Sequence, residues 1–155
     1  MKFTKGYWMN LPGVTNTDAV QVREVKVEND RVYLYTVPYH ADMRAMGGPL
    51  LEMYISSPQP DIIRTEAYHF MGSNQKMPAF ELNDAHCALE VENTETTVTI
   101  KSGNTKLVIG KNPCSFDYYY KDKKLTSVGN RFGSAMISTI STPDGNYMRA
   151  QMDLD

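Results

Sequence analysis

The amino-acid sequence predicts an all-β protein, an antiparallel β-sandwich with little helix. Three observations support this fold class. Short apolar segments that alternate with polar residues recur along the chain, turn-forming residues separate them at even spacing, and no window carries the sustained apolar stripe of an amphipathic helix. Ten glycines and eight prolines in 155 residues also oppose long helices. Evenly spaced short strands are typical of a sandwich or barrel rather than of alternating strand and helix units.

The first predicted elements form a hairpin. Residues 20–27 read VQVREVKV and 31–37 read RVYLYTV, and the turn-forming pair Asn29-Asp30 lies between them. Residues 40–46 (HADMRAM) are the best helical candidate, but this segment is short and ends at a Gly-Gly-Pro sequence. We therefore predict a hairpin followed by a loop or a single helical turn.

A second series of strands is predicted in the C-terminal half. The breakers between its members are rich in Asn, Gly, Pro and Asp, which favour turns. We expect these segments to be antiparallel strands of a sandwich or barrel. The five predicted segments are 87–93, 95–100, 105–110, 114–120 and 124–129.

The sequence Glu66-x-x-His69 has the spacing of two metal ligands on one helix face. Its segment is bounded by SSPQPD and MGSNQKMP, which predicts a strand of about nine residues, placed inside the sandwich. On a strand the two side chains point to opposite faces, so we expect no metal site. For His69 we favour a core position over a contact with another domain.

Composition limits the partners and the compartment. Sixteen basic residues against eighteen acidic residues give a formal charge of −2 without blocks of like charge, so neither nucleic acid nor a membrane surface is expected as a partner. Apolar runs are far shorter than the roughly 20 residues of a membrane span, and Lys5 and Gly6 interrupt any N-terminal signal. We expect a cytoplasmic protein with one domain over residues 1–155.

Few residues are candidates for a site. Trp8 and the run Tyr118, Tyr119 and Tyr120 could stack on sugar rings, although core or interface positions are the more common use of such aromatics. The thiols of Cys87 and Cys114 are expected to be free and structural. There is no nucleophile elbow, phosphate loop or dinucleotide fingerprint, so no catalytic residue and no cofactor is assigned.

Several segments nonetheless resemble a known family. The opening MKFTKGYWMNLPGV, GGPLLEMYISSPQPDIIR at 47–64, HFMG at 69–72, PAFELN at 78–83, and the long stretch 101–129 are similar, in this order, to the N-terminal domain of glycoside hydrolase family 31 enzymes of the α-xylosidase branch. The tail YMRAQMDLD resembles the segment that precedes the family's Gly-Glu-x-x-Tyr-Gly-Leu-Gly-Glu-Arg motif.

This resemblance implies a galactose-mutarotase-like sandwich joined to a catalytic (β/α)₈ barrel that lies outside residues 1–155. The barrel of such enzymes carries the two aspartates of a retaining mechanism. The chain is then expected to be an inactive fragment of an α-glycosidase, whose partners are its own barrel, α-linked xylose-containing oligosaccharides and further subunits of a homo-oligomer.

One departure from the family and two alternatives remain. The branch commonly has Arg-x-Glu-His-Phe, whereas this chain has Tyr68 before His69, so a polar role shared by that pair is in doubt. An autonomous carbohydrate-binding module is one alternative. An aldose mutarotase is the other, and it needs an acid and a base at the anomeric centre, which Glu66 and His69 on opposite faces cannot supply.

Overall fold

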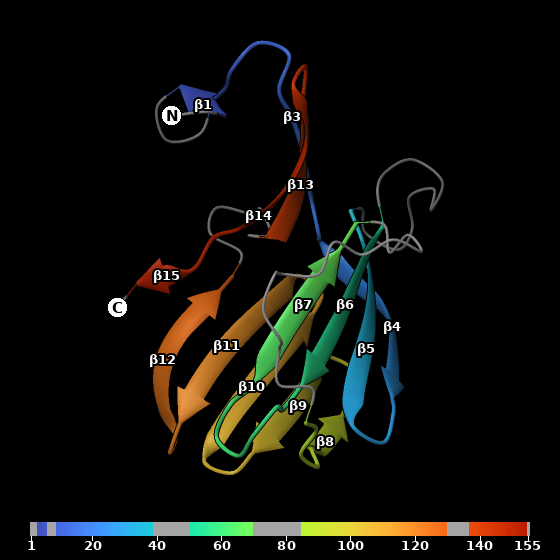
Figure 1. Cartoon of the computed structure of the whole chain (residues 1–155), viewed down its shortest axis with the longest axis vertical. Coiled ribbons are helices and arrows are strands. Elements are labelled where there is room, and N and C mark those ends of the chain that lie inside the picture. Colours follow the sequence, from blue (N-terminus) through green and yellow to red (C-terminus); the bar gives the residue numbers. More distant parts are fainter. Residues whose placement is uncertain (1–2, 6–8, 39–49, 70–84, 130–136, 155) are drawn as a thin grey trace.

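The computed structural model describes residues 3–5, 9–38, 50–69, 85–129 and 137–154. In these ranges every regular element is a β-strand, and all strand pairs are antiparallel. Two sheets face each other as a sandwich, and a third sheet extends from one end of it (Figure 1). The predicted all-β antiparallel sandwich is confirmed. The 40–46 segment lies outside the described residues.

The first sheet of the sandwich has four strands in chain order, β4-β5-β6-β7. The predicted hairpin is confirmed, with the pairing Val27↔Val32 beside its turn and a β-bulge between Val22 and Glu24. The strand that follows the 39–49 segment, β6, has no counterpart among the predicted strands. The bounds are β4 (Gln21–Val27), β5 (Arg31–Val37), β6 (Leu51–Ser56) and β7 (Arg64–Tyr68).

The second sheet has six strands in the order β15-β12-β11-β10-β9-β8. Five of them are consecutive in the chain, correspond to the five predicted segments and pair in chain order, and a short later strand adds to the edge of the sheet. The bounds are β8 (Glu90–Asn93), β9 (Thr97–Ser102), β10 (Thr105–Lys111), β11 (Cys114–Tyr120), β12 (Lys123–Val128) and β15 (Asp153–Leu154).

The core lies between these two sheets. Alternate residues of the central strands point inward, because side chains of a strand alternate between its two faces. These side chains form one contiguous cluster, and the most deeply buried members have at most 1% of their surface exposed. They are Val32, Leu34, Met53, Ile55, Val98, Ile100, Leu107, Ile109 and Phe116.

Hydrogen bonds also join the two sheets. The hydroxyl oxygens of Ser57 and Ser102 lie 2.6 Å apart in the interior, and the Tyr118 hydroxyl lies 3.0 Å from Thr65 Oγ1. At another point the backbone N–H of Cys114 donates to the carbonyl of Val20 over 2.7 Å. These bonds satisfy polar groups that the packing removes from water.

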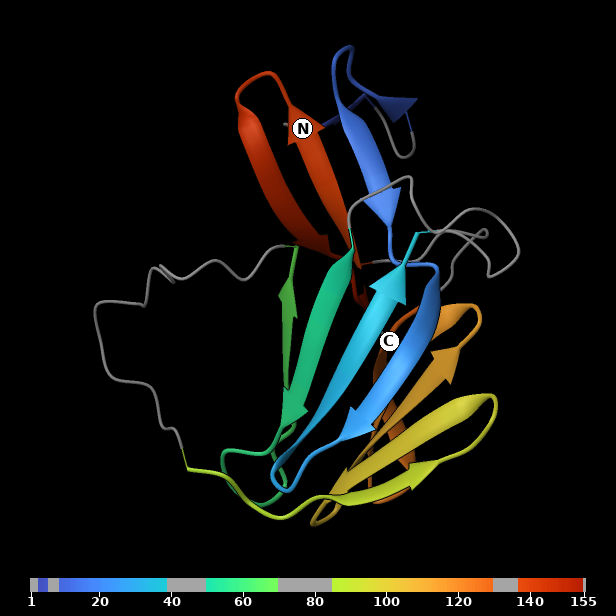
Figure 2. The ribbon, with the colours of Figure 1, turned by 90° about the vertical axis from the view of Figure 1, so that its right-hand side faces the viewer.

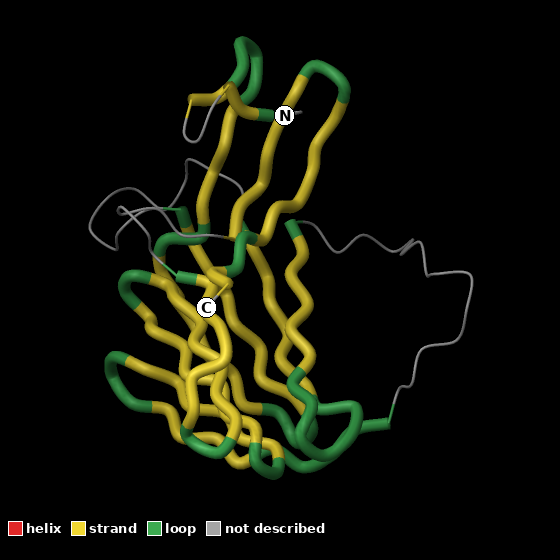
Figure 3. The backbone as a smooth tube through the Cα atoms, turned by 90° about the vertical axis from the view of Figure 1, so that its left-hand side faces the viewer, coloured by secondary structure: helices red, strands yellow, loops and turns green. Residues whose placement is uncertain are grey.

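The third sheet has three strands in the order β14-β13-β3, so β13 (Ile137–Thr142) lies between β3 (Thr15–Asp18) and β14 (Gly145–Ala150). Figures 2 and 3 show it extending beyond one end of the sandwich. These three strands have no counterpart among the predicted ones. Near the N-terminus, two strands of two residues each pair with one another: β1 (Thr4–Lys5) and β2 (Met9–Asn10).

Three expectations about the Glu66-His69 segment are wrong. The strand has five residues rather than about nine, and it is the edge strand of its sheet rather than an inner one. His69 follows the last residue of β7 and is exposed, so it is not a core histidine. The physical reason is that the strand ends before His69, which then no longer shares the inward face of Thr65 and Ala67.

Within the described ranges, no helix has the length and apolar character that a membrane crossing requires.

Candidate functional site

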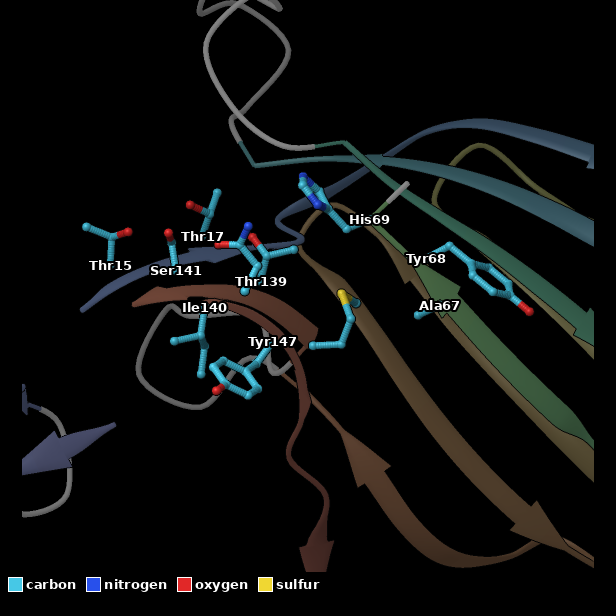
Figure 4. A pocket seen from close by; sticks show the side chains of 11 residues that line it. Thr15, Thr17, Ala67, Tyr68, His69, Thr139, Ile140, Ser141 and Tyr147 are labelled. Atoms are coloured by element: carbon cyan, nitrogen blue, oxygen red, sulfur yellow. The ribbon is translucent and has the colours of Figure 1, made fainter. Parts of the chain in front are cut away.

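A cavity of about 590 Å³ lies between the three-stranded sheet and the end of β7. This volume is within the usual range of small-molecule sites. Figure 4 shows the side chains around it. The residues that line it are Thr15, Thr17, Ala67, Tyr68, His69, Thr139, Ile140, Ser141, Asn146, Tyr147 and Met148.

The register of the three-stranded sheet explains which side chains meet there. Thr139 is paired with one residue on each neighbouring strand, and so is Ser141 two positions later. Residues directly opposite each other on antiparallel strands share a face, and so do residues i and i+2. Two parallel rows of side chains therefore cover one face, which we name the hydroxyl face. The rows are Thr17, Thr139 and Met148, and then Thr15, Ser141 and Asn146.

Figure 4 shows the orientation of these residues. Thr15, Thr17 and Ser141 project from one side of the sheet, whereas Ile140 and Tyr147 project from the other. The ring of Tyr68 points away from the cavity, toward the outer face of β7. The hydroxyl face and His69 thus supply the polar groups of the cavity.

The described part of the cavity is not lined by charged side chains of the acidic or basic type. The described residues that line it include no Asp, Glu, Lys or Arg, and His69 supplies their one imidazole. No hydrogen bond among the described residues uses the side chains of Thr15, Thr17, Thr139 or Ser141. These hydroxyls can therefore both donate to and accept from a ligand.

The three consecutive tyrosines of β11 do not form one continuous surface. Tyr118 packs against the core and bonds Thr65, and burial raises the pKa of its phenol. Tyr119 is paired with Lys106, whose Nζ lies 4.9 Å from the centre of the ring. Tyr120 is 38% exposed and has the Nζ of Lys121 5.5 Å from its ring centre. Trp8 lies outside the described residues.

Glu66 and His69 do not converge. Glu66 lies on the outer face of β7, where its carboxylate accepts a hydrogen bond from the Tyr68 hydroxyl over 3.0 Å and lies 3.4 Å from Arg64. His69 borders the cavity instead. Among the described residues, no group of three His, Cys, Asp or Glu could hold a metal ion.

The outer face of the four-stranded sheet carries a strip of tyrosines with their own partners. Tyr33 and Tyr54 have ring centres 5.3 Å apart, and those of Tyr54 and Tyr68 are 6.1 Å apart. The Tyr33 hydroxyl donates to Glu52 over 2.9 Å, and burial together with this bond raises the pKa of the phenol. The Arg31 guanidinium lies 4.8 Å from the ring centre of Tyr54.

Both cysteines are free, as expected, but only one is buried. Burial raises the pKa of the Cys114 thiol to about 12, so this thiol remains protonated and unreactive at neutral pH. Cys87 is half-buried.

No protein-family model matches this chain. It is 23% identical over 161 aligned positions to Alpha-xylosidase XylQ of Lactiplantibacillus pentosus, and this match covers 99% of the chain and 20% of that protein. The resemblance to an enzyme of the α-xylosidase branch is confirmed.

Solved structures share the fold. The cycloalternan-forming enzyme of Listeria monocytogenes, in complex with a pentasaccharide substrate, matches with a TM-score of 0.62 and 18% identity over 86% of this chain and 11% of that chain. An uncharacterised protein of the same organism, in complex with glucose, magnesium and calcium, matches with a TM-score of 0.62 and 16% identity, over 89% of this chain and 12% of that one. At these identities the likeness establishes the fold alone.

Proposed function

We propose that this chain is the non-catalytic N-terminal β-sandwich domain of a retaining α-glycosidase of glycoside hydrolase family 31. The observation that carries the proposal is the match to an α-xylosidase, which includes nearly all of this chain but one fifth of that enzyme. A piece that aligns from end to end with a small part of an enzyme corresponds to one of its domains, and the remaining four fifths have room for a barrel of about 250 residues.

The chemistry of the described residues is compatible with an accessory role. Glycoside hydrolysis uses two carboxyl groups that face each other across the scissile bond. The residues lining the cavity carry no carboxyl group, and Glu66, the nearest carboxylate in sequence to His69, is turned toward Tyr68 and Arg64. In this proposal the sandwich supports the barrel and its substrate cleft, and the barrel supplies the two aspartates.

Hydrolysis assays test the proposal directly. The purified chain of residues 1–155 should release no nitrophenol from p-nitrophenyl α-xyloside, while the natural protein that contains this sequence should do so. Removal of residues 1–155 from that protein should abolish the activity or the soluble expression of the remainder, because apolar surface at the domain interface becomes exposed. Hydrolysis by the isolated chain at a rate that repeated purification does not reduce would refute the proposal.

The preferred substrate is a finer part of the proposal. We propose an α-xyloside, because the matched enzyme is named for that activity. The ratio of kcat/KM for p-nitrophenyl α-xyloside to that for p-nitrophenyl α-glucoside measures the preference in the natural protein. A ratio below one would be consistent with a glycosidase but would contradict the proposed preference for an α-xyloside.

A further inference from the structure

We propose that the cavity between the hydroxyl face and the end of β7 is a non-catalytic binding site for a neutral saccharide of two or three units. The proposal rests on the side chains of this chain and does not require that a glycosidase be attached to it. Three features carry it: the pattern of hydroxyl groups, the absence of charged side chains from the lining, and the apolar side chains beside the hydroxyls.

The hydroxyl face presents a regular grid of hydrogen-bonding groups. Paired residues across antiparallel strands have Cβ atoms about 5 Å apart, and residues i and i+2 along a strand lie about 7 Å apart. Thr15, Thr17, Thr139 and Ser141 occupy four points of this grid. Its dimensions are close to those of a pyranose ring, so neighbouring hydroxyls can reach groups on opposite sides of one sugar.

These groups are available in the described structure. Thr139 is the most enclosed of them, with 9% of its surface exposed at the centre of the sheet, and it has no hydrogen-bonding partner for its hydroxyl among the described residues. A hydroxyl without a protein partner can both donate to and accept from a ligand. Sugar hydroxyl groups have that dual character.

The lining also limits the ligand by charge. A phosphate or carboxylate ligand requires Arg, Lys or a set of converging backbone N–H groups, and a cationic ligand requires carboxylates or an aromatic cage. Among the described lining residues there is no Lys, Arg, Asp or Glu. Hydroxyls, one amide and one imidazole are suited to a neutral polyol.

Apolar side chains complete the site. Met148 belongs to the same row as Thr17 and Thr139, is 42% exposed and lines the cavity together with Ala67. The C–H faces of pyranose rings pack against such flexible, polarisable side chains. A cavity with a few placed polar groups beside apolar ones has the usual composition of a small-molecule site.

The aromatic surfaces of the domain fit a saccharide less well. Stacking requires an open ring face, but cations lie over the rings of Tyr33, Tyr54 and Tyr119 at 5.3, 4.8 and 4.9 Å from the ring centres. The rings of Tyr33 and Tyr54 are also tilted by 54° to each other, so they do not form one flat platform. The hydroxyl face is the better site on both grounds.

Titration of the ¹⁵N-labelled chain with maltotriose and, separately, isoprimeverose tests the proposal. Millimolar concentrations of either saccharide should shift the backbone amide resonances of β3, β13 and β14. Thr139→Val and Thr17→Val remove one hydroxyl each without changing the shape of the side chain or the β-propensity of the strand. Each should weaken binding about threefold to tenfold, the effect of losing one neutral hydrogen bond.

Thr99→Val is the matched control. Thr99 lies between the buried residues Val98 and Ile100 and therefore points to the outer face of the six-stranded sheet, away from the cavity. The affinity of the Thr99→Val variant for the saccharide should equal that of the unmodified chain. Chemical shifts also report whether each variant is folded, so a loss of binding is separated from a loss of structure.

Three outcomes would overturn the proposal. They are the absence of shifts with both saccharides, shifts concentrated around Tyr119 and Tyr120, and unchanged affinity in Thr139→Val. Tighter binding of glucuronate than of the neutral saccharides would also contradict the assigned ligand class. These results concern binding by residues 1–155 alone, so they are independent of whether the natural protein hydrolyses α-xylosides.

Discussion

Asp18 is a partly buried carboxylate whose ionisation opposes folding. It lies across Ser138 from Arg149 on the face of the three-stranded sheet opposite the hydroxyl face. Burial raises its pKa above 3.8, and the hydrogen bond from Asn16 over 2.7 Å and the charge of Arg149 offset this only in part. A carboxyl group with a raised folded-state pKa binds its proton more tightly in the folded chain than in the unfolded one.

Asp18→Asn should therefore stabilise the protein at neutral pH. The variant removes the buried charge and keeps an oxygen that can accept from Asn16. The destabilisation that it relieves is fully present above the folded-state pKa and disappears below 3.8, where the carboxyl group is protonated in both states. Thermal unfolding of the two proteins should differ at neutral pH and coincide in strong acid.

Asp122 provides a control of opposite sign. The Lys106 ammonium lies 2.9 Å from its carboxylate and lowers the pKa of this exposed group. Its contribution to stability is present above the unfolded pKa and lost as the pH falls through the folded pKa. Asp122→Asn should not stabilise the chain at neutral pH, and a gain there equal to that of Asp18→Asn would show that the burial argument is wrong.

At the scale of the element, the turn between β9 and β10 is fixed by one residue of the loop before β7. Asp61 accepts hydrogen bonds from the backbone N–H and the side-chain amide of Asn104, and its carbonyl accepts from Thr105 Oγ1 over 2.7 Å. Gly103 adopts a φ of +57°, and a Cβ atom there would clash with Asp61 Oδ1. The turn and the loop thus require a glycine at this position.

Gly103→Ala should destabilise the domain by about 1–3 kcal/mol, because it adds strain at a positive φ and displaces the Asp61 carboxylate from Asn104. Gly129→Ala is the matched control, since nothing lies within 4 Å of a Cβ atom at that position. Urea denaturation of the two variants measures the difference. Equal midpoints would mean that neither the positive φ of Gly103 nor its contact with Asp61 contributes measurably to stability.

Elements differ in how far a single sequence predicts them. β4, β5 and the strands from β8 to β12 were predicted because alternating apolar residues face one core and turn residues separate them. β13 escaped prediction because Ile137 and Ile140 are three positions apart and fall on opposite faces of the strand. The other residues of this strand are Ser and Thr, so the segment shows no alternation of apolar and polar residues.

At the scale of the whole molecule, stability depends on packing between the two sheets of the sandwich. Phe116 belongs to β11, the third strand of the six-stranded sheet, and has 1% of its surface exposed. Phe116→Ala should cost about 3–5 kcal/mol, because the lost contacts leave a cavity in a rigid core. Leu125→Ala, at a side chain that is 49% exposed, should cost less than about 1 kcal/mol. Denaturant unfolding measures both values, and similar costs would contradict the assigned core.

The candidate site was the part least accessible from sequence. Alternating hydroxyl residues at 15 and 17 and at 139 and 141 are visible in the chain, but this pattern gains meaning only when β3 pairs with β13. The two strands are separated by more than a hundred residues, β3 is polar on both faces, and each face of β13 mixes one Ile with Ser and Thr. Register between such strands is set by the surrounding fold rather than by a local pattern.

The sequence by itself determined the all-β class, the first hairpin, the five consecutive strands of the C-terminal half and the resemblance to an α-xylosidase, because each depends on short-range patterns or on residue identity in order along the chain. Only the tertiary structure decided that β7 is an edge strand, that His69 is exposed, that Tyr118 is turned into the sandwich, and that hydroxyls from both ends of the chain form one face. Those outcomes depend on which strands become neighbours, and that is fixed by burial of the whole apolar surface rather than by any one segment.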